Sequence, residues 1–141
     1  MSAKPISILL GAVWWVCSTL TWAGTPAPDG ARVYIILPTD GAVVTSPVKV
    51  RFGLSGMGVA PAGTDNKHTG HHHLLIDVDR LPPLDRPLPS DAQHRHFGGG
   101  QTETELELAP GRHTLQLLLG DGNHIPHEPA LLSKKITIEV K

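Results

Sequence analysis

Hydrophobic and polar residues alternate along much of the chain beyond residue 31, with the period of two that is typical of strands buried on one face. The clearest alternation covers residues 48–54, where apolar side chains are separated by lysine, arginine and glycine. The pattern predicts six strands, which cover residues 32–37, 48–54, 71–78, 102–108, 112–119 and 136–140. A helical period of useful length is absent, so the pattern favours an all-β protein.

The turns between these strands favour a single β-sandwich domain. Six strands and one proline-rich segment within residues 32–141 are typical of an immunoglobulin-like or fibronectin-like sandwich of six to seven strands. The chain contains 15 glycines and 13 prolines, which suits short strands joined by many turns. Residues 108–115 resemble the corner before the sixth strand of such folds, where a tyrosine usually takes the place of His113. We therefore expect His113 to have a packing and hydrogen-bonding role, and His72, on the core-facing side of its strand, to have a similar one.

The N-terminal segment has the composition of a secretory signal peptide. Lys4 precedes an apolar run over residues 6–16, and small residues follow near Ala23. The run is too short to span a membrane comfortably. We therefore expect cleavage after Ala23, a short N-terminal tail over residues 24–31, and a periplasmic or secreted location. The single cysteine lies within residues 1–23, so the exported chain would have no thiolate ligand and no disulfide.

Charge excludes some partners, and one residue type stands out. The chain has 12 Lys and Arg residues against 13 Asp and Glu residues, a formal net charge of −1. This balance argues against nucleic acid or an anionic membrane surface as a charge-driven partner, and we expect no membrane span in the exported chain. Histidine, by contrast, occurs nine times.

Most of these histidines lie in connections that the predicted topology brings to one end of the sandwich. Residues 79–93 contain four prolines and cannot form a central strand, so we expect them to cross the domain as an irregular extended segment. With that crossing, the alternating strand directions place the connections 55–70, 94–100 and 120–130 at the same end. Without it, the histidines of residues 71–73 would lie at the opposite end. The predicted convergence therefore depends on the proline-rich segment.

Converging imidazoles can form a transition-metal site, because neutral ring nitrogens bind Cu(II) and Zn(II), and three or four rings complete a site. The candidate ligands, of which the last is a reserve together with His68, are His71, His73, His94, His96, His124 and His127. The usual affinity order favours Cu(II), with Zn(II) second. Met57 is a candidate weak axial ligand. The carboxylates that could accept the other ring N–H groups are Asp77, Glu103 and Asp121.

The same histidines are compatible with other functions. Crowded imidazoles repel one another when protonated, so the group could sense pH near 6. Asn66, Gln93, Gln101 and the glycine run at residues 98–100 could instead recognise an anionic or carbohydrate ligand. A third alternative is a non-catalytic cell-envelope adhesion or scaffold module in which the histidines are structural.

Catalysis is not expected. The exported chain has no cysteine, no serine in a nucleophile-elbow motif and no HExxH sequence. Glu103, near the histidine-rich end, is the residue that leaves a metal-activated hydrolase as an alternative. The sequence therefore predicts an exported β-sandwich that binds a metal ion, most readily copper, as a carrier or a sink.

Three motifs carry a resemblance to a known family. They are GHHHLLID at residues 70–77, HFGGGQTE at residues 96–103 and LLGDGNHIPH at residues 118–127. Together they resemble a family of small exported bacterial domains catalogued only as a domain of unknown function, over about residues 32–141. The resemblance implies export and a β-rich domain and brings no assigned activity or site residue. The sandwich form and histidine-rich loops are also similar to cupredoxin-like periplasmic copper proteins, without a residue-by-residue match.

Overall fold

The computed structural model describes residues 24–141, and the predicted signal peptide lies outside the described residues. This part of the chain is all β, with no helix and 44% strand. Its strands are β1 (Arg32–Leu37), β2 (Val43–Val44), β3 (Val48–Ser55), β4 (Gly58–Val59), β5 (Thr69–Ile76), β6 (His94–His96), β7 (Glu103–Leu106), β8 (Gly111–Gly120) and β9 (Ile136–Val140). No helix in the described part has the length and apolar character needed to cross a membrane.

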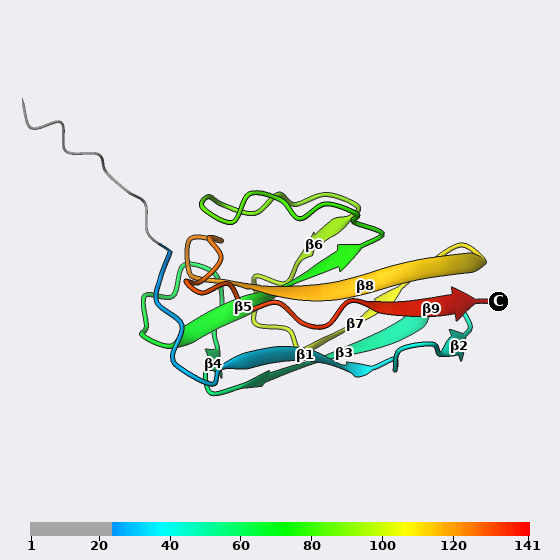
Figure 1. Ribbon diagram of the computed structural model, residues 1–141, viewed down its shortest axis with the longest axis horizontal. Coiled ribbons are helices and arrows are strands. Elements are labelled where there is room, and N and C mark those ends of the chain that lie inside the picture. Colours follow the sequence, from blue (N-terminus) through cyan, green and yellow to red (C-terminus); the bar gives the residue numbers. More distant parts are fainter. Residues whose placement is uncertain (1–23) are drawn as a thin grey trace, which may run out of the picture.

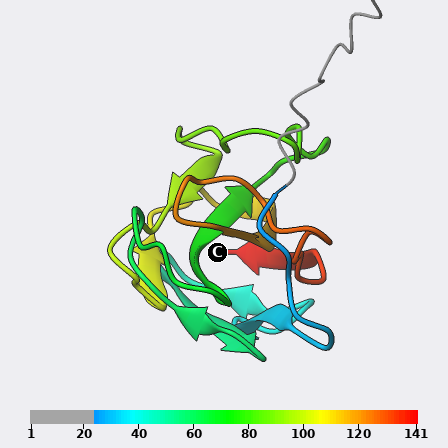
Figure 2. The same cartoon turned by 90° about the vertical axis from the view of Figure 1, so that its left-hand side faces the viewer.

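Two sheets pack face to face, as Figures 1 and 2 show. The smaller sheet has the order β1-β3-β7, and the larger has the order β2-β9-β8-β5-β4 with β6 also paired to β5. Most neighbouring strands are antiparallel, whereas β2 runs parallel to β9 and β4 parallel to β5. The centre of the larger sheet is built from β5, β8 and β9, the third, fifth and last of the six long strands, and it faces a sheet built from the others, as in immunoglobulin-like sandwiches. The predicted fold class is confirmed.

The alternation read from the sequence explains how the sheets meet. In β3, Val48, Val50 and Phe52 are buried and point toward the larger sheet. In β8, the odd-numbered leucines from Leu115 to Leu119 are buried in the same core. All six predicted strands are present with small shifts at their ends. The strands that the sequence pattern missed, β2, β4 and β6, have only two or three residues, too few to display a period.

The larger sheet is also covered on its outer side. Every residue of β5 after Thr69 is buried, including those that point away from the main core. Leu75 of β5 and Leu118 of β8 are 2% and 0% exposed, yet neither belongs to the main core. Leu88, in the proline-rich segment, is likewise buried outside that core. The segment therefore forms a third layer over β5 and β8, visible above them in Figure 1.

The predicted crossing by residues 79–93 is wrong. The segment leaves the end of β5, extends to the loop after β8, where the Leu88 amide donates to the His124 carbonyl at 2.9 Å, and then returns. On its return, the Gln93 side chain donates to the Asp77 carbonyl at 3.0 Å, so the segment ends where it began. β6 then makes the passage along β5 in the opposite direction. Four prolines allow this excursion because a covering layer does not need every ladder hydrogen bond.

The segment at residues 24–31, predicted to be a tail, lies against the body of the domain. Pro26 forms a parallel bridge with Glu128, and the Ala27 amide donates to the Glu128 carbonyl at 2.9 Å. The hydroxyl of Thr25 donates to the Asp121 carboxylate at 2.6 Å. Figure 2 shows the segment running beside the loop that follows β8. These contacts place the start of the described chain at the histidine-rich end.

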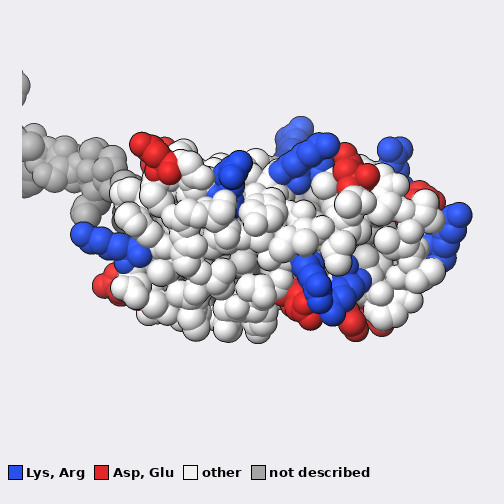
Figure 3. All heavy atoms as spheres, turned by 90° about the horizontal axis from the view of Figure 1, so that it is seen from below, with Lys and Arg blue, Asp and Glu red and all other residues white. Residues whose placement is uncertain are grey.

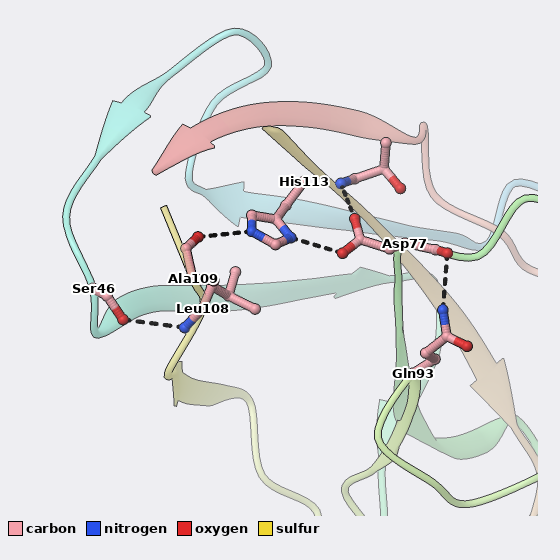
Figure 4. Close-up of polar contacts among 7 residues, drawn as sticks. Ser46, Asp77, Gln93, Leu108, Ala109 and His113 are labelled. Atoms are coloured by element: carbon pink, nitrogen blue, oxygen red, sulfur yellow. Dashed lines mark hydrogen bonds and ion pairs between the residues drawn. The ribbon is translucent and has the colours of Figure 1, made fainter. Parts of the chain in front are cut away.

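The corner between β7 and β8 has the predicted form. The His113 ring lies between two oxygen atoms, with Nε2 2.9 Å from the Ala109 carbonyl and Nδ1 2.7 Å from the Asp77 carboxylate (Figure 4), and the protonated ring donates to both. The bond to a carbonyl four residues upstream is the one that a corner tyrosine makes in related sandwiches. The inward direction predicted for His72 is also observed, since its ring lies 5.2 Å from that of Phe52.

The smaller sheet carries ordinary surface charge. Glu103 of β7 pairs with Lys49 at 3.1 Å and with Arg51 at 3.0 Å, both on β3. Figure 3 shows the face seen from below, on which basic and acidic side chains are interspersed. Glu103 thus lies on the sheet opposite to β5 and β6, and the prediction that it supports the histidines is wrong.

Candidate metal centre

Four histidines from three separate segments point to one place on the outer side of the larger sheet. His71 and His73 are two residues apart on β5 and share its outer face. His96 on β6 lies directly opposite His73, and Gly120 at the end of β8 lies opposite His71. The loop after Gly120 carries His124 back over the pair. Each of the four rings offers one nitrogen, and these atoms all lie within 4.8 Å of one another.

The closest nitrogen contacts are between rings. His73 Nε2 lies 3.0 Å from His71 Nε2, which in turn lies 3.2 Å from His124 Nδ1. All six pairs of ring centroids are separated by 4.7 to 6.1 Å. The four side chains therefore surround a common point and do not stack as separate pairs.

Two glycines leave room for these rings. A Cβ added at Gly120 would lie 2.9 Å from His73 Nε2, closer than a side chain tolerates. A Cβ added at Gly98 would overlap the His96 ring. The sequence predicted that residues 98–100 would form a connection or supply backbone donors. The space that Gly98 leaves for the His96 ring was not predicted, because it depends on the pairing of β5 with β6.

The loop that holds His124 is closed by hydrogen bonds to Asp121. One carboxylate oxygen of Asp121 accepts the backbone amides of Asn123 at 2.8 Å and Ile125 at 3.0 Å. The backbone groups of Asp121 bond to those of His124 and Ile125. His124 has a φ of 65°, a left-handed conformation that a non-glycine residue adopts only when its surroundings require it. The loop thus fixes the direction of the fourth ring.

Burial keeps the inner rings uncharged. His71 and His73 are 0% and 1% exposed, whereas His96 is exposed and His124 partly buried. Burial, followed by the neighbouring imidazoles, lowers the pKa of His71 to about 4 and that of His73 to about 3. Burial and the nearby His124 ring also lower the pKa of His96. At neutral pH these three rings therefore keep a lone pair on one nitrogen, the form that binds a metal ion.

The hydrogen-bonding state of the two buried rings, His71 and His73, is also compatible with a bound metal ion. Nδ1 of His71 and Nδ1 of His73 are buried and have no hydrogen-bond partner among the described residues. The Nε2 atoms of the two rings face one another instead, where a shared hydrogen bond can use only one proton. A cation between them would use both lone pairs, with the protons on Nδ1.

Comparison with known protein families identifies the family to which the chain belongs. A family model described as a domain of unknown function, DUF4399, matches residues 50–141. The chain belongs to the DUF4399 family. The match includes all four histidines of the centre and confirms the resemblance inferred from the three motifs. No curated protein and no solved structure gave a significant match to this DUF4399 protein.

The other predicted ligands of the DUF4399 domain lie outside the group of four. His94 shares the strand and face of His96, but its Nδ1 lies 2.9 Å from the Asp91 carboxylate. His127 is buried, and its Nε2 donates to the Thr69 carbonyl at 3.2 Å. His68 is an exposed loop residue.

The predicted supporting groups are only partly in place. Met57 packs against the main core of the domain and is not part of the group. Asp77 lies at the far end of β5, bonded to His113. Asp121 adjoins the centre but bonds to its own loop and to Thr25, and not to a ring nitrogen. The ring nitrogens of the inner pair therefore lack the carboxylate partners that the sequence suggested.

Proposed function

We propose that this DUF4399 protein is an exported, non-catalytic metal-binding protein that holds one copper ion through His71, His73, His96 and His124. It would act in the periplasm or after secretion as a carrier or a sink for the ion. The observation that supports this function is the meeting of four imidazole nitrogens within 4.8 Å of one another.

The spacing of the nitrogens supports binding without large movement. A metal–nitrogen bond of about 2.0–2.1 Å places neighbouring nitrogens roughly 2.9 Å apart in a square and roughly 3.4 Å apart in a tetrahedron. The two closest contacts here, 3.0 and 3.2 Å, lie between these values. The longest separation, up to 4.8 Å, requires an inward shift of the outer rings of about an ångström.

The ligand type favours copper. Imidazole sets bind divalent first-row metals in an order that peaks at Cu(II) and falls again at Zn(II). A set without thiolate or carboxylate offers nothing that reverses this order. Zn(II) is therefore the second candidate.

The exposure of the ligands favours a carrier over a sealed store. His71 and His73 lie on a central strand of the sheet and are closed to solvent, whereas His96 is exposed on the short strand β6. An ion could therefore enter and leave past His96 while the inner pair keeps its place. Exchange of this kind is what a protein that passes on its metal requires.

The decisive experiment is a titration of the exported protein, purified without an affinity tag, with Cu(II) and with Zn(II). We expect one copper per chain and stronger binding of copper than of zinc. His71→Ala with His96→Ala should weaken copper binding by at least a hundredfold. His94→Ala is the matched control, since it removes an imidazole two residues from His96 and outside the group.

Micromolar or weaker binding that the double variant does not change would contradict the proposal. The histidines would then be structural, as in an adhesion or scaffold module. Electron paramagnetic resonance of the copper-loaded protein supplies an independent measurement, because coupling to four equivalent nitrogens is expected from the four rings.

A further inference from the structure

A buried carboxylate adjoins the four-histidine centre without being one of its ligands. Asp121 is 6% exposed and directly follows Gly120, the residue that lies opposite His71 in the sheet. Three residues later, His124 reaches back to within 3.2 Å of His71. The carboxylate is therefore enclosed by the same loop that closes the centre. The negative charge of Asp121 also acts on His71, where it opposes the lowering of the His71 pKa by burial.

The hydrogen bonds of Asp121 hold the carboxylate in place and occupy both of its oxygens. Oδ1 accepts the amides of Asn123 and Ile125, and Oδ2 accepts the Thr25 hydroxyl at 2.6 Å. Three donors hold the two carboxylate oxygens in fixed positions. A carboxylate so engaged has little freedom to turn toward a metal ion. It acts on the centre through its charge.

Charge matters at this centre because the four ligands supply none. An ion held by neutral imidazoles keeps its full charge in a partly buried layer, and this costs more for a divalent ion than for a monovalent one. One nearby negative charge attracts a divalent ion with twice the energy that it gives a monovalent ion.

We propose that Asp121 is the charge-compensating residue of the centre and selects divalent ions, Cu(II) above all, over Cu(I). This inference rests on the proposed function and names the oxidation state in which the protein takes its ion. Thr25 carries no charge and donates its hydroxyl to one carboxylate oxygen, so the charge beside Asp121 can be changed at this position without replacing Asp121.

The test is Asp121→Asn, which keeps the shape of the side chain and its ability to accept the two loop amides while removing the charge. We expect affinity for Cu(II) to fall by roughly a hundredfold and affinity for Cu(I) by roughly tenfold, in keeping with their charges. This tenfold difference raises the Cu(II)/Cu(I) midpoint potential by about 59 mV. Both affinities are measured by competition with chelators, and the potential by mediated titration of the loaded protein.

Two substitutions at Thr25 make the test independent of the folding of the asparagine variant. Thr25→Lys places a cation beside the intact Asp121 and should raise the potential in the same direction. Thr25→Val removes the hydroxyl without changing charge and should leave the potential within about 15 mV of the wild-type value, a change of less than about twofold in relative affinity.

Equal losses of Cu(I) and Cu(II) affinity in Asp121→Asn, with an unchanged potential, would overturn the inference and leave Asp121 as a residue that only shapes the loop. An unchanged potential in Thr25→Lys would overturn it as well. A wild-type protein that binds no copper would overturn the proposed function and this inference together, so the two failures are distinguishable.

Discussion

Two histidine sites lie near opposite ends of the paired strands β5 and β8, and they differ in what their ring nitrogens face. At the corner end, both nitrogens of His113 face oxygen acceptors, from Ala109 and Asp77. At the other end, the nitrogens of His71 face those of His73 and His124. The hydrogen bond to Asp77 raises the pKa of His113, whereas burial lowers the pKa of His71 and His73.

The difference separates a structural histidine from a candidate ligand. A ring whose two nitrogens both face oxygen acceptors can donate its protons within the fold and needs no ion. Neutral rings whose nitrogens face one another leave some of those nitrogens without a hydrogen-bond partner, because each ring carries only one N–H. A cation at the common point can be bound by the lone pairs of such a group.

The largest expected effect is stabilisation of the protein by copper, which should depend on the four-histidine centre and not on His113. Copper at about a thousand times its dissociation constant should raise the free energy of unfolding of the wild-type protein by about 4 kcal/mol. This gain should vanish in His71→Ala with His73→Ala and persist in His113→Phe. Thermal unfolding with and without Cu(II) measures it, and a gain that depends on His113 instead would reverse the assignment of the two sites.

A second effect concerns the pH dependence of stability without metal. Because the pKa values of His71 and His73 are lowered from 6.5 to about 4 and about 3, the unfolded chain binds more protons between these limits. Stability is thus fully present above pH 6.5 and falls as the pH decreases, by about 1.4 kcal/mol per unit for each ring at most. Unfolding in urea at pH 7, 6 and 5 checks this.

His113 should act in the opposite direction. Its raised pKa adds stability that is present below pH 6.5 and is lost as the pH rises through the folded-state pKa of His113.

The control for the acid effect is the replacement of His71 and His73 by alanine, which should flatten the loss of stability between pH 6.5 and 5. A wild-type protein with a constant melting temperature from pH 7 to 5 would contradict the neutral state assigned to the inner rings.

The corner should show a smaller effect that is independent of metal. His113→Phe keeps a ring but leaves the Ala109 carbonyl and the Asp77 carboxylate without their donor, which should cost about 1–2 kcal/mol of unfolding free energy. His113→Tyr should recover part of this loss, because its hydroxyl can donate to the Ala109 carbonyl as in other sandwich corners. Chemical denaturation measures both variants, and copper affinity should be unchanged in each.

The smallest effect belongs to His94, which the sequence placed among the ligands. His94→Ala removes a bond to the exposed Asp91 and should change stability by less than about 0.5 kcal/mol. Its copper affinity should stay within about threefold of the wild-type value, because a ring outside the group makes no bond to the ion. A loss comparable to that of His96→Ala, measured in the same titration, would add a fifth ligand to the centre.

Much of the architecture follows from local patterns. The alternation in residues 48–54 and 112–119 predicts which side chains form the core, because a strand directs successive side chains to opposite faces. The same rule separates His72, directed at Phe52, from the outward pair His71 and His73. The corner role of His113 also follows from its position relative to a turn. Such features involve residues close together in the chain.

The predicted route of the proline-rich segment was wrong, although the histidines that it was meant to bring together do meet. Strand β6 has only three residues, so no period indicates that it returns along β5. The position of the covering layer that contains Leu88 was not predicted either, because one apolar residue among prolines does not indicate where it packs. The same applies to His94 and His127, whose partners, Asp91 and Thr69, are decided by loop conformation.

By itself, the sequence determined the all-β class, the faces of the long strands and the abundance of histidine. Only the tertiary structure decided which four imidazoles share a point, that Gly98 and Gly120 leave space for two of them, and that Asp121 closes the loop instead of contacting a ring. The physical reason is the separation along the chain of the residues that interact. Strand periodicity is imposed by neighbouring residues, whereas the centre depends on contacts between segments up to 53 residues apart, whose register no local pattern encodes.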